Sequence, residues 1–245
     1  MKRIIQRELL DTLPFDAPRA VRSRRDLQRV NGWMRHPALM ADALRNNWNG
    51  LAPRQITELG AGDGDFLLRV AQRLGSFGVP AWAGPGRLNA ELPTEIVNVT
   101  LLDLQKNVSA ETLAGFGKLG WRAETVMADV FDWPQNSNAG DVVIANLFLH
   151  HFGDARLAEL LRLISQRAKL FIALEPRRAP WPLFCSRLLW AIGCNDVTRH
   201  DAVVSVRAGF SGGELSALWP EQQHWRLTER RAGIFSHLFI AQKMS

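Results

Sequence analysis

Residues 56 to 66, Ile-Thr-Glu-Leu-Gly-Ala-Gly-Asp-Gly-Asp-Phe, combine acidic side chains with regularly spaced glycines. Glu58 stands two positions before the first of three alternate glycines, Gly60, Gly62 and Gly64. Glycine permits positive φ and lets a ligand lie directly against the backbone. A helix that follows such a turn points its N-terminal amides at the ligand, while Glu58 adds negative charge. This chemistry suits a ligand that carries positive charge and hydroxyls better than it suits a pyrophosphate.

Other nucleotide sites also use a glycine-rich turn after a strand. The glycines of this turn match neither the dinucleotide fingerprint GxGxxG nor the phosphate loop GxxxxGK. An acidic residue followed by three alternate glycines resembles the first motif of class I S-adenosylmethionine-dependent methyltransferases. In that family the acidic residue lies near the methionine amine, so the resemblance places Glu58 and Ala61 in the cofactor site with the glycines. Another nucleotide-binding turn or a tight structural turn is the alternative.

Two later strand ends carry acidic residues that extend this resemblance. The second predicted strand ends in Leu-Leu-Asp-Leu, where Asp103 can accept hydrogen bonds from both ribose hydroxyls and Leu104 follows in the site. The third ends in Met-Ala-Asp-Val-Phe, where the resemblance places Asp129 at the exocyclic amine of adenine and Val130 or Phe131 against the ring. Ordinary turn-forming aspartates and a core phenylalanine are the alternatives.

The segment Asn146-Leu-Phe-Leu-His-His-Phe follows the fourth predicted strand and is similar to a segment of class I methyltransferases. The resemblance places Asn146 and Leu147 beside the methionine arm and the methyl group. His150 or His151 is a candidate general base on a phenol or enol, because imidazole accepts a proton near neutral pH. Packing beneath the cofactor is the alternative for both. Methyl transfer requires no metal, and we expect no metal site.

The order of elements predicts an α/β fold, because strand-like and helical segments alternate after residue 55. We expect a Rossmann-like, mainly parallel seven-stranded sheet with helices on both faces and an antiparallel last strand. Residues 1–50 are predicted to form an N-terminal helical cover, with one helix over 20–45, and residues 51–245 the methyltransferase domain. The predicted strands are 56–60, 96–104, 123–128, 141–145, 170–174, 225–230 and 235–241; the predicted helices are 66–74, 111–119, 154–167 and 183–192, and 75–95 is predicted to be a loop.

An apolar segment is the predicted acceptor pocket. Residues 181 to 192 are rich in Trp, Phe and Leu and are followed by Arg199, His200 and Asp201, although core packing or self-association would explain the same residues. The leading hypothesis is a methyltransferase for a small aromatic or polyketide-derived acceptor, with O-methylation favoured and C-methylation open. An RNA methyltransferase and a non-catalytic cofactor-binding or scaffold protein are the alternatives.

The composition and charge of the chain limit the classes of molecule that it is expected to bind. The chain of 245 residues has a net charge of +6, and basic residues outnumber acidic ones in its first 36 positions. We expect no nucleic-acid partner, because the Asn-Leu-Phe-Leu segment lacks the prolines of amino-methylating nucleic-acid enzymes. Peripheral contact with a membrane or a lipidic substrate remains open. No apolar stretch approaches a membrane span and no secretory signal is visible, so a cytoplasmic location is expected. Cys185 and Cys194 indicate neither a zinc site nor a disulfide.

Overall fold

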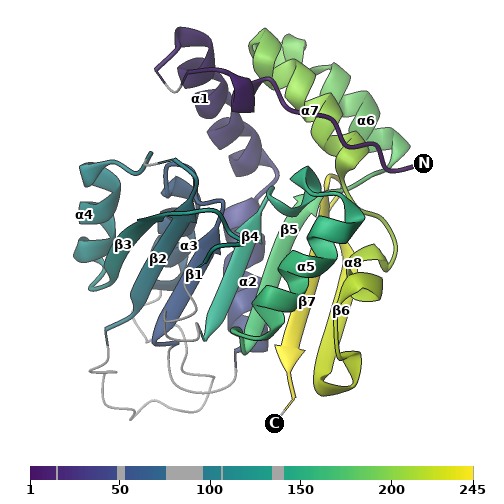
Figure 1. Cartoon of the computed structure of the whole chain (residues 1–245). Helices are drawn as coiled ribbons and strands as arrows, with labels where there is room; N and C mark the ends of the chain where they lie inside the picture. Colours follow the sequence, from purple (N-terminus) through teal and green to yellow (C-terminus); the bar gives the residue numbers. More distant parts are fainter. Residues whose placement is uncertain (15, 49–52, 76–95, 106, 134–140, 245) are drawn as a thin grey trace.

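A seven-stranded sheet forms the centre of the molecule (Figure 1). The computed structural model describes residues 1–14, 16–48, 53–75, 96–105, 107–133 and 141–244. The strand order is β3-β2-β1-β4-β5-β7-β6; neighbours from β3 to β5 run parallel, and β7 runs antiparallel to both of its neighbours. This confirms the predicted mainly parallel sheet with an antiparallel last strand. The strands are β1 (Gln55–Leu59), β2 (Asn98–Asp103), β3 (Arg122–Met127), β4 (Val142–Asn146), β5 (Leu170–Pro176), β6 (Trp225–Ala232) and β7 (Ser236–Lys243).

Helices cover both faces of the sheet, as predicted, and three more lie above its upper edge (Figure 1). Helices α2, α3 and α4 cover one face and α5 and α8 cover the other, whereas α1, α6 and α7 lie above the carboxyl ends of the parallel strands. The α-helices are α1 (Pro18–Trp33), α2 (His36–Asn47), α3 (Asp65–Gly75), α4 (Ala110–Lys118), α5 (Asp154–Ser165), α6 (Pro180–Arg187), α7 (Asp196–Ala208) and α8 (Glu214–Leu218); the 3-10 helices are η1 (Leu10–Thr12), η2 (Leu149–His151), η3 (Leu189–Ile192) and η4 (Gln222–His224).

Two apolar cores lie on opposite sides of the sheet. Successive side chains of a strand point to opposite faces. In β4, Val142 and Ile144 accordingly belong to the core beneath α2 and α3, while Val143 and Ala145 belong to the core beneath α5 and α8. Burial on both faces explains why the sequence of this strand is continuously apolar.

The single helix predicted for residues 20–45 is wrong, because the chain forms α1 and α2 with a break between them. Arg35 adopts the left-handed conformation with φ of 59°, and Pro37 occupies the first turn of α2. A proline has no backbone N–H to donate to the preceding turn and is tolerated only in the first turn of a helix, so α1 cannot continue through Pro37. Met40 and Leu44 of α2 are fully buried in one of the two cores. Helix α2 is therefore part of the main domain, and α1 alone remains as a helical cover.

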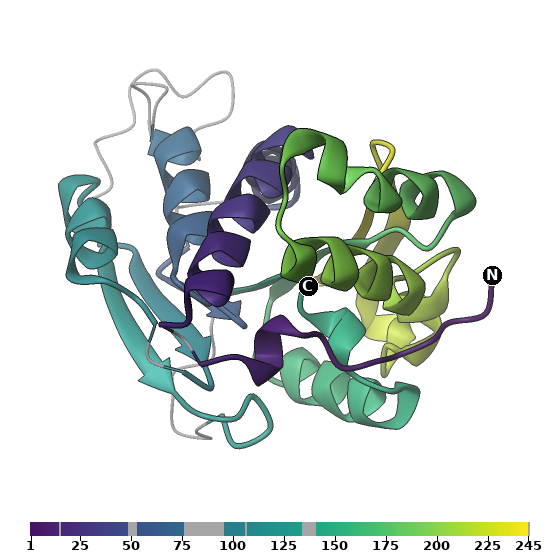
Figure 2. The same cartoon turned by 90° about the horizontal axis from the view of Figure 1, so that it is seen from above.

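Several elements were not predicted. An N-terminal segment, residues 1–14, runs across the top of the molecule to α1, and Figure 2 shows it passing α5 and α7. Helices α7 and α8 were missed, and the predicted helix over 183–192 is divided between α6 and η3. The predicted loop over 75–95 lies outside the described residues from position 76 onward. Among the helices that the structure describes, none has the length and apolar character to cross a bilayer.

Candidate functional site

A cavity of about 300 Å³ lies where β1, β2 and β4 end. The chain leaves β1 toward β2 on one side and returns to β4 on the other, so strand order reverses here, which is where open α/β sheets bind ligands. Seven of the predicted site residues line this cavity. They are Glu58, Gly60, Ala61, Gly62, Asp103, Asn146 and Leu147.

The three alternate glycines all adopt positive φ, with values of 66°, 55° and 73° for Gly60, Gly62 and Gly64. A Cβ on Gly60 would lie 2.3 Å from the ring of Phe148, and one on Gly64 would lie 2.9 Å from Leu101. A Cβ on Gly62 would meet no protein atom within 4 Å. Gly60 and Gly64 are therefore required by packing as well as conformation. Gly62 keeps open the space that a ligand occupies against the turn.

Asp103 connects the end of β2 to the glycine turn. Its Oδ2 accepts the backbone N–H of Gly62 at 2.9 Å, and its Oδ1 accepts that of Gln105 at 2.9 Å. A carboxylate has about four acceptor positions, so each oxygen keeps one for a ligand. Asp103 also lines the cavity. This arrangement fits the predicted hydrogen bonds to ribose hydroxyls, which stay a prediction.

Glu58 gives the cavity a site for a positive charge. Its side chain is buried, its Oε2 has no hydrogen-bond partner among the described residues, and it faces the cavity. Burial, and then the negative charges of Asp63, Asp103 and Asp65, raise its pKa well above the usual value. A cationic ligand would supply the missing partner and relieve that repulsion. The orphaned oxygen and the open space at Gly62 thus fit the amino and sulfonium groups of S-adenosylmethionine.

Besides Gly64, four of the predicted cofactor residues do not line this cavity. Leu104 is 68 % exposed, and Val130 is buried in a core. Asp129 accepts the backbone N–H of Phe131 at 2.9 Å, and that ring stacks beneath the guanidinium of Arg156 at 3.4 Å. None of these four lines the cavity in the part of the chain that is described. Their predicted contacts with adenine stay predictions.

His150 lies between two carboxylates rather than in the cavity. Its Nδ1 lies 2.8 Å from Glu175 and its Nε2 3.3 Å from Glu8. Burial lowers its pKa, but the hydrogen bonds and charges of Glu175 and Glu8 outweigh burial and raise the pKa to about 9. An imidazolium has no lone pair to accept a proton, so this geometry does not support the predicted base role. Glu175 also accepts the backbone N–H groups of Phe148 and Leu149, which anchors η2.

His151 faces the N-terminal segment. Its ring lies 4.3 Å from that of His150, and its Nδ1 lies 3.6 Å from Asp11. Burial, and then the positive charge of His150, lower its pKa. His151 lines neither this cavity nor the second one described below. The alternative drawn from the sequence was packing beneath the cofactor, whereas in the structure both histidines pack beneath the N-terminal segment.

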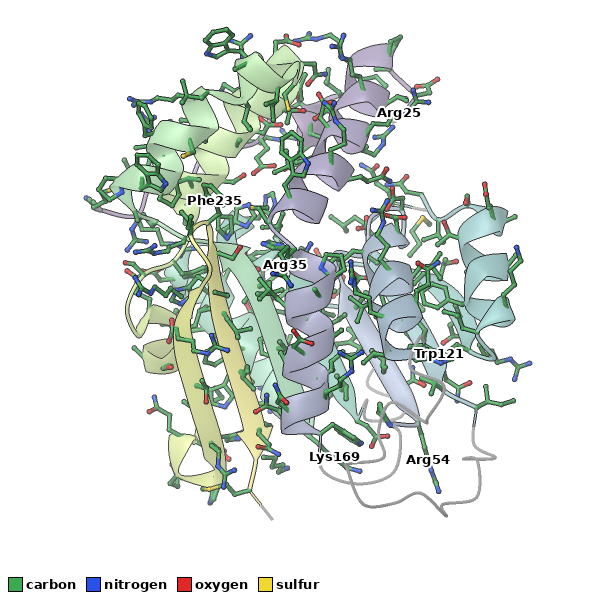
Figure 3. The ribbon with its side chains drawn as sticks, turned by 180° about the vertical axis from the view of Figure 1, so that it is seen from behind. Arg25, Arg35, Arg54, Trp121, Lys169 and Phe235 are labelled. Atoms are coloured by element: carbon green, nitrogen blue, oxygen red, sulfur yellow. The ribbon has the colours of Figure 1, made fainter. Side chains whose placement is uncertain are left out.

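A second cavity of about 320 Å³ adjoins the first, and three residues, Leu27, Asn31 and Leu147, line both. Its walls are mostly apolar and come chiefly from α1, α6, η3, α7 and the β6–β7 turn. Figure 3 shows Phe235 of that turn beneath the helices. The predicted acceptor segment contributes in part. Pro182, Cys185, Ser186, Leu188, Leu189 and Ile192 line the cavity. Trp181, Leu183, Phe184, Trp190, Arg199, His200 and Asp201 do not.

Asp201, which was assigned to the acceptor pocket, instead holds the N-terminal segment. Its carboxylate oxygens accept the backbone N–H groups of Leu9 and Leu10 at 2.8 and 2.9 Å. Leu10, Asp11 and Leu13 then line the first cavity. The N-terminal segment therefore covers the cofactor side of the site together with α1, which contributes Arg24, Leu27, Gln28, Asn31 and Gly32 to the lining.

His36 is a polar residue between the two cavities that the sequence interpretation did not assign to the site. It is fully buried, it lines the second cavity, and its Nδ1 lies 2.7 Å from Oδ1 of Asn146 in the wall of the first. Because that oxygen only accepts, Nδ1 carries the proton and Nε2 accepts the hydroxyl of Ser236 at 2.6 Å. Burial lowers the pKa of His36 to about 4. A lone histidine before a proline gave no sequence signal for this position.

A comparison with protein families supports a methyltransferase site at the ends of the strands. A family model described as a methyltransferase domain matches residues 80–169, a range that begins after the glycine turn and contains Asp103, Asp129 and Asn146. A search of curated protein sequences found no significant match.

Solved structures of methyltransferases share the fold. A plantazolicin methyltransferase in complex with SAH is 12% identical with a TM-score of 0.63, and the alignment covers 94% of this chain and 92% of that one. Mitomycin 7-O-methyltransferase is 20% identical (TM-score 0.58; 95% and 60% covered). Magnesium protoporphyrin IX methyltransferase from Synechocystis PCC 6803 is 13% identical (TM-score 0.57; 94% and 96% covered). The domain match and the shared fold agree with the predicted class I methyltransferase, and the SAH bound in two of the neighbours agrees with the predicted cofactor, S-adenosylmethionine.

Proposed function

Because the chain has the fold and the matched domain of class I methyltransferases, we propose that it transfers a methyl group from S-adenosylmethionine to a hydroxyl of a small, apolar acceptor. The observation that carries this proposal is the contact between the two cavities at Leu27, Asn31 and Leu147. One cavity is acidic and suits a cationic cofactor, and its neighbour is almost wholly apolar. Apolar walls with a few polar groups are typical of sites for small organic ligands.

The chain's own residues would mainly bind and orient the reactants. When bound, S-adenosylmethionine supplies the methyl group on a sulfonium, which is already a strong leaving group. Glu58 and Asp103 hold the cofactor's charge and hydroxyls, and Leu147 lies where the two cavities meet. Holding two reactants in line converts a bimolecular reaction into an effectively unimolecular one, which accounts for much of the rate of such reactions.

His36 is the group best placed to take the acceptor's proton. Its low pKa keeps the imidazole neutral above about pH 5, so its Nε2 can accept a proton from an acceptor hydroxyl that replaces Ser236 as its partner. The hydrogen bond to Asn146 fixes the ring and its tautomer beside the cofactor cavity. This arrangement favours O-methylation of an acidic hydroxyl, such as a phenol or enol, because His36 is a weak base.

An aromatic or polyketide-derived acceptor fits the second cavity best. Phe235, Leu188 and Leu189 offer flat and branched apolar surfaces, and no Lys or Arg is among the described residues that line the cavity, so its interior does not suit an RNA phosphate. The second candidate function is methyl transfer to a ring carbon of the same kind of acceptor. A protein that only binds the cofactor would not need a second, apolar cavity beside the cofactor cavity, so the pair of cavities favours an enzyme over a non-catalytic protein.

Two measurements test this function in sequence. Calorimetry with S-adenosylmethionine should show binding, and its absence would refute the cofactor site itself. Methyl transfer should then be assayed on a panel of phenols, enols, quinones and RNA, with mass spectrometry to locate the new methyl group. We expect transfer to oxygen of a phenol or enol. Binding without transfer to any acceptor, or transfer to RNA alone, would contradict the proposal.

A further inference from the structure

The outer side of the second cavity carries large apolar side chains that face solvent. Trp33 and Leu188 line the cavity and are 63% and 42% exposed. Nearby on α6 and η3, Trp181, Phe184 and Trp190 are between 50% and 59% exposed, and the rings of Trp181 and Phe184 stack at 5.6 Å. We call these five residues the apolar rim. Clustered exposure of this kind marks an interaction surface.

Arginines lie beside the apolar rim. Arg22, Arg25 and Arg29 recur at helical spacing on the solvent side of α1, and Trp33 continues the same line at its end. Figure 3 shows Arg25 above the sheet, on the side of α1 that faces away from α6 and α7. Arg22 lies nearer the apolar rim, because it donates to the carbonyl oxygen of Gly193 just after η3. Arg187 is exposed at the end of α6. This face therefore combines aromatic side chains with positive charge.

Acidic residues do not offset that charge on the elements that form the face. Helices α1 and α6 and the 3-10 helix η3 contain one acidic residue, Asp26. Asp26 is buried and accepts hydrogen bonds from Arg29 and from the backbone of Asn195. Indole rings beside arginines are the side chains that anchor proteins at the headgroup level of a bilayer, and the arginines are attracted to anionic lipids.

We infer that the apolar rim and the arginines of α1 dock the protein on an anionic membrane, with the second cavity opening toward the lipid. This inference rests on the proposed function, because it makes the acceptor a lipophilic molecule that enters the cavity from the bilayer. Trp33 and Leu188 then serve both surfaces, since they contact lipid on one side and line the cavity on the other.

A second copy of the chain is a poorer occupant of this face. A symmetric contact would place the same patch against itself. Arg22 and Arg25 of each copy would then approach the arginines of the other, and like charges at an interface are unfavourable. An anionic bilayer complements both the charge and the aromatic side chains.

Co-sedimentation with vesicles tests the inference. The full chain should pellet with vesicles of phosphatidylglycerol and phosphatidylcholine, bind vesicles of phosphatidylcholine alone more weakly, and be released by high salt. The double variant Trp181→Ala/Phe184→Ala should lower the vesicle partition coefficient at least about tenfold, because it removes two large apolar anchors. Arg22→Gln/Arg25→Gln should lower binding to the anionic vesicles only.

Matched controls lie at the opposite end of the sheet. Ile96, just before β2, is 59% exposed like Trp190, and Arg122 is exposed at the start of β3. Ile96→Ala and Arg122→Gln should leave vesicle binding unchanged. Equal binding by the rim variant and the wild type would overturn the inference, as would an absence of binding to anionic vesicles.

Two further readouts separate this inference from its alternatives. A dimer in sedimentation velocity that the Trp181→Ala/Phe184→Ala change dissociates would overturn membrane docking in favour of self-association. Cofactor affinity, measured by calorimetry without vesicles, should be the same in the rim variant and the wild type. A failure of the proposed function would instead appear as absent methyl transfer with vesicle binding intact.

Discussion

His36 and Asn146 join the two cavities through one hydrogen bond, with His36 Nδ1 2.7 Å from Asn146 Oδ1. Asn146 lines the cofactor cavity at the end of β4, and His36 lines the apolar cavity at the start of α2. The amide oxygen of Asn146 determines the tautomer of the His36 ring, and the ring N–H in turn fixes the orientation of the Asn146 amide. Any group placed between the two cavities therefore meets an imidazole of fixed orientation.

Replacing His36 should slow methyl transfer without weakening cofactor binding. The variant His36→Asn keeps a polar group near Nδ1 and removes Nε2, so we expect kcat to fall by about a hundredfold or more. The Kd for S-adenosylmethionine should stay within about twofold. His224→Asn, at a site 61% exposed in η4, is the control and should behave as the wild type. An unchanged kcat in His36→Asn would show that His36 is not the general base.

Changing Glu58 to Gln should weaken cofactor binding and leave the fold intact. The substitution keeps the shape of a buried side chain and removes the charge that a cationic ligand needs, so affinity should fall on the order of tenfold to a hundredfold. Calorimetry measures this. The free energy of unfolding should not decrease, since the variant removes the repulsion that raises the Glu58 pKa. If Glu58→Gln keeps the wild-type affinity for S-adenosylmethionine, the positively charged groups of the cofactor do not bind at Glu58.

Cofactor binding should also release a proton from Glu58. Its pKa is raised in the free protein, so its charge is lost as pH falls and the neutral form has to ionise when a cation binds. Affinity should therefore rise with pH, by at most tenfold per pH unit for one proton. Calorimetry in buffers of different ionisation enthalpy counts the protons released. In Glu58→Gln that release should disappear.

Gly62→Ala should have two separable effects: backbone strain, which lowers the stability of the protein, and loss of space for the cofactor, which lowers cofactor affinity. A left-handed alanine costs about 1–2 kcal/mol in stability, and its Cβ would project into open cavity. Gly120→Ala is a matched control, because Gly120 also has positive φ and an unobstructed Cβ position but lies between α4 and β3. Both variants should lose similar stability in urea unfolding, whereas cofactor affinity should fall only in Gly62→Ala. A similar loss of affinity in both would assign the effect to the fold alone.

His150 should make stability depend on pH. Its folded pKa of about 9 lies above the ordinary value of 6.5, so its contribution is complete below pH 6.5 and is lost as pH rises through 9, by about 3 kcal/mol in total. Urea unfolding across this range measures the loss. His150→Gln leaves Glu175 buried without its charge partner and should cost about 3–5 kcal/mol at pH 6. Glu8→Gln, a milder change, should shift the fall in stability to lower pH.

Chelation should leave methyl transfer unchanged. Glu8, His150 and His151 do bring potential ligand atoms within 4.8 Å of one another. Both ring nitrogens of His150 are hydrogen-bonded to carboxylates, however, and the ring is protonated at neutral pH. An assay with and without EDTA decides this. Loss of activity restored by a divalent ion would make these three residues a metal site.

Local sequence patterns determined the cofactor side of this protein. The three glycines between β1 and α3 can adopt positive φ without a Cβ penalty, and acidic residues at strand ends must gather at one edge of a parallel sheet. The positions of Glu58 and Asp103 in this cavity were therefore predictable from the glycine turn and the topology, whereas Asn146 was placed by the resemblance of its segment to class I methyltransferases. The alternation of strands and helices likewise determined the sheet, because burial on both faces requires continuous apolar strands such as β4.

Only the tertiary structure decided the acceptor side and the state of the histidines. His36 reaches Asn146, and Asp201 reaches Leu9, across long stretches of sequence that carry no periodic pattern. His150 became a cation because folding placed Glu8 and Glu175 on either side of it. A pKa depends on burial and on neighbouring charges, which are properties of space rather than of sequence order. The sequence therefore could not show which histidine is neutral and lines the apolar cavity.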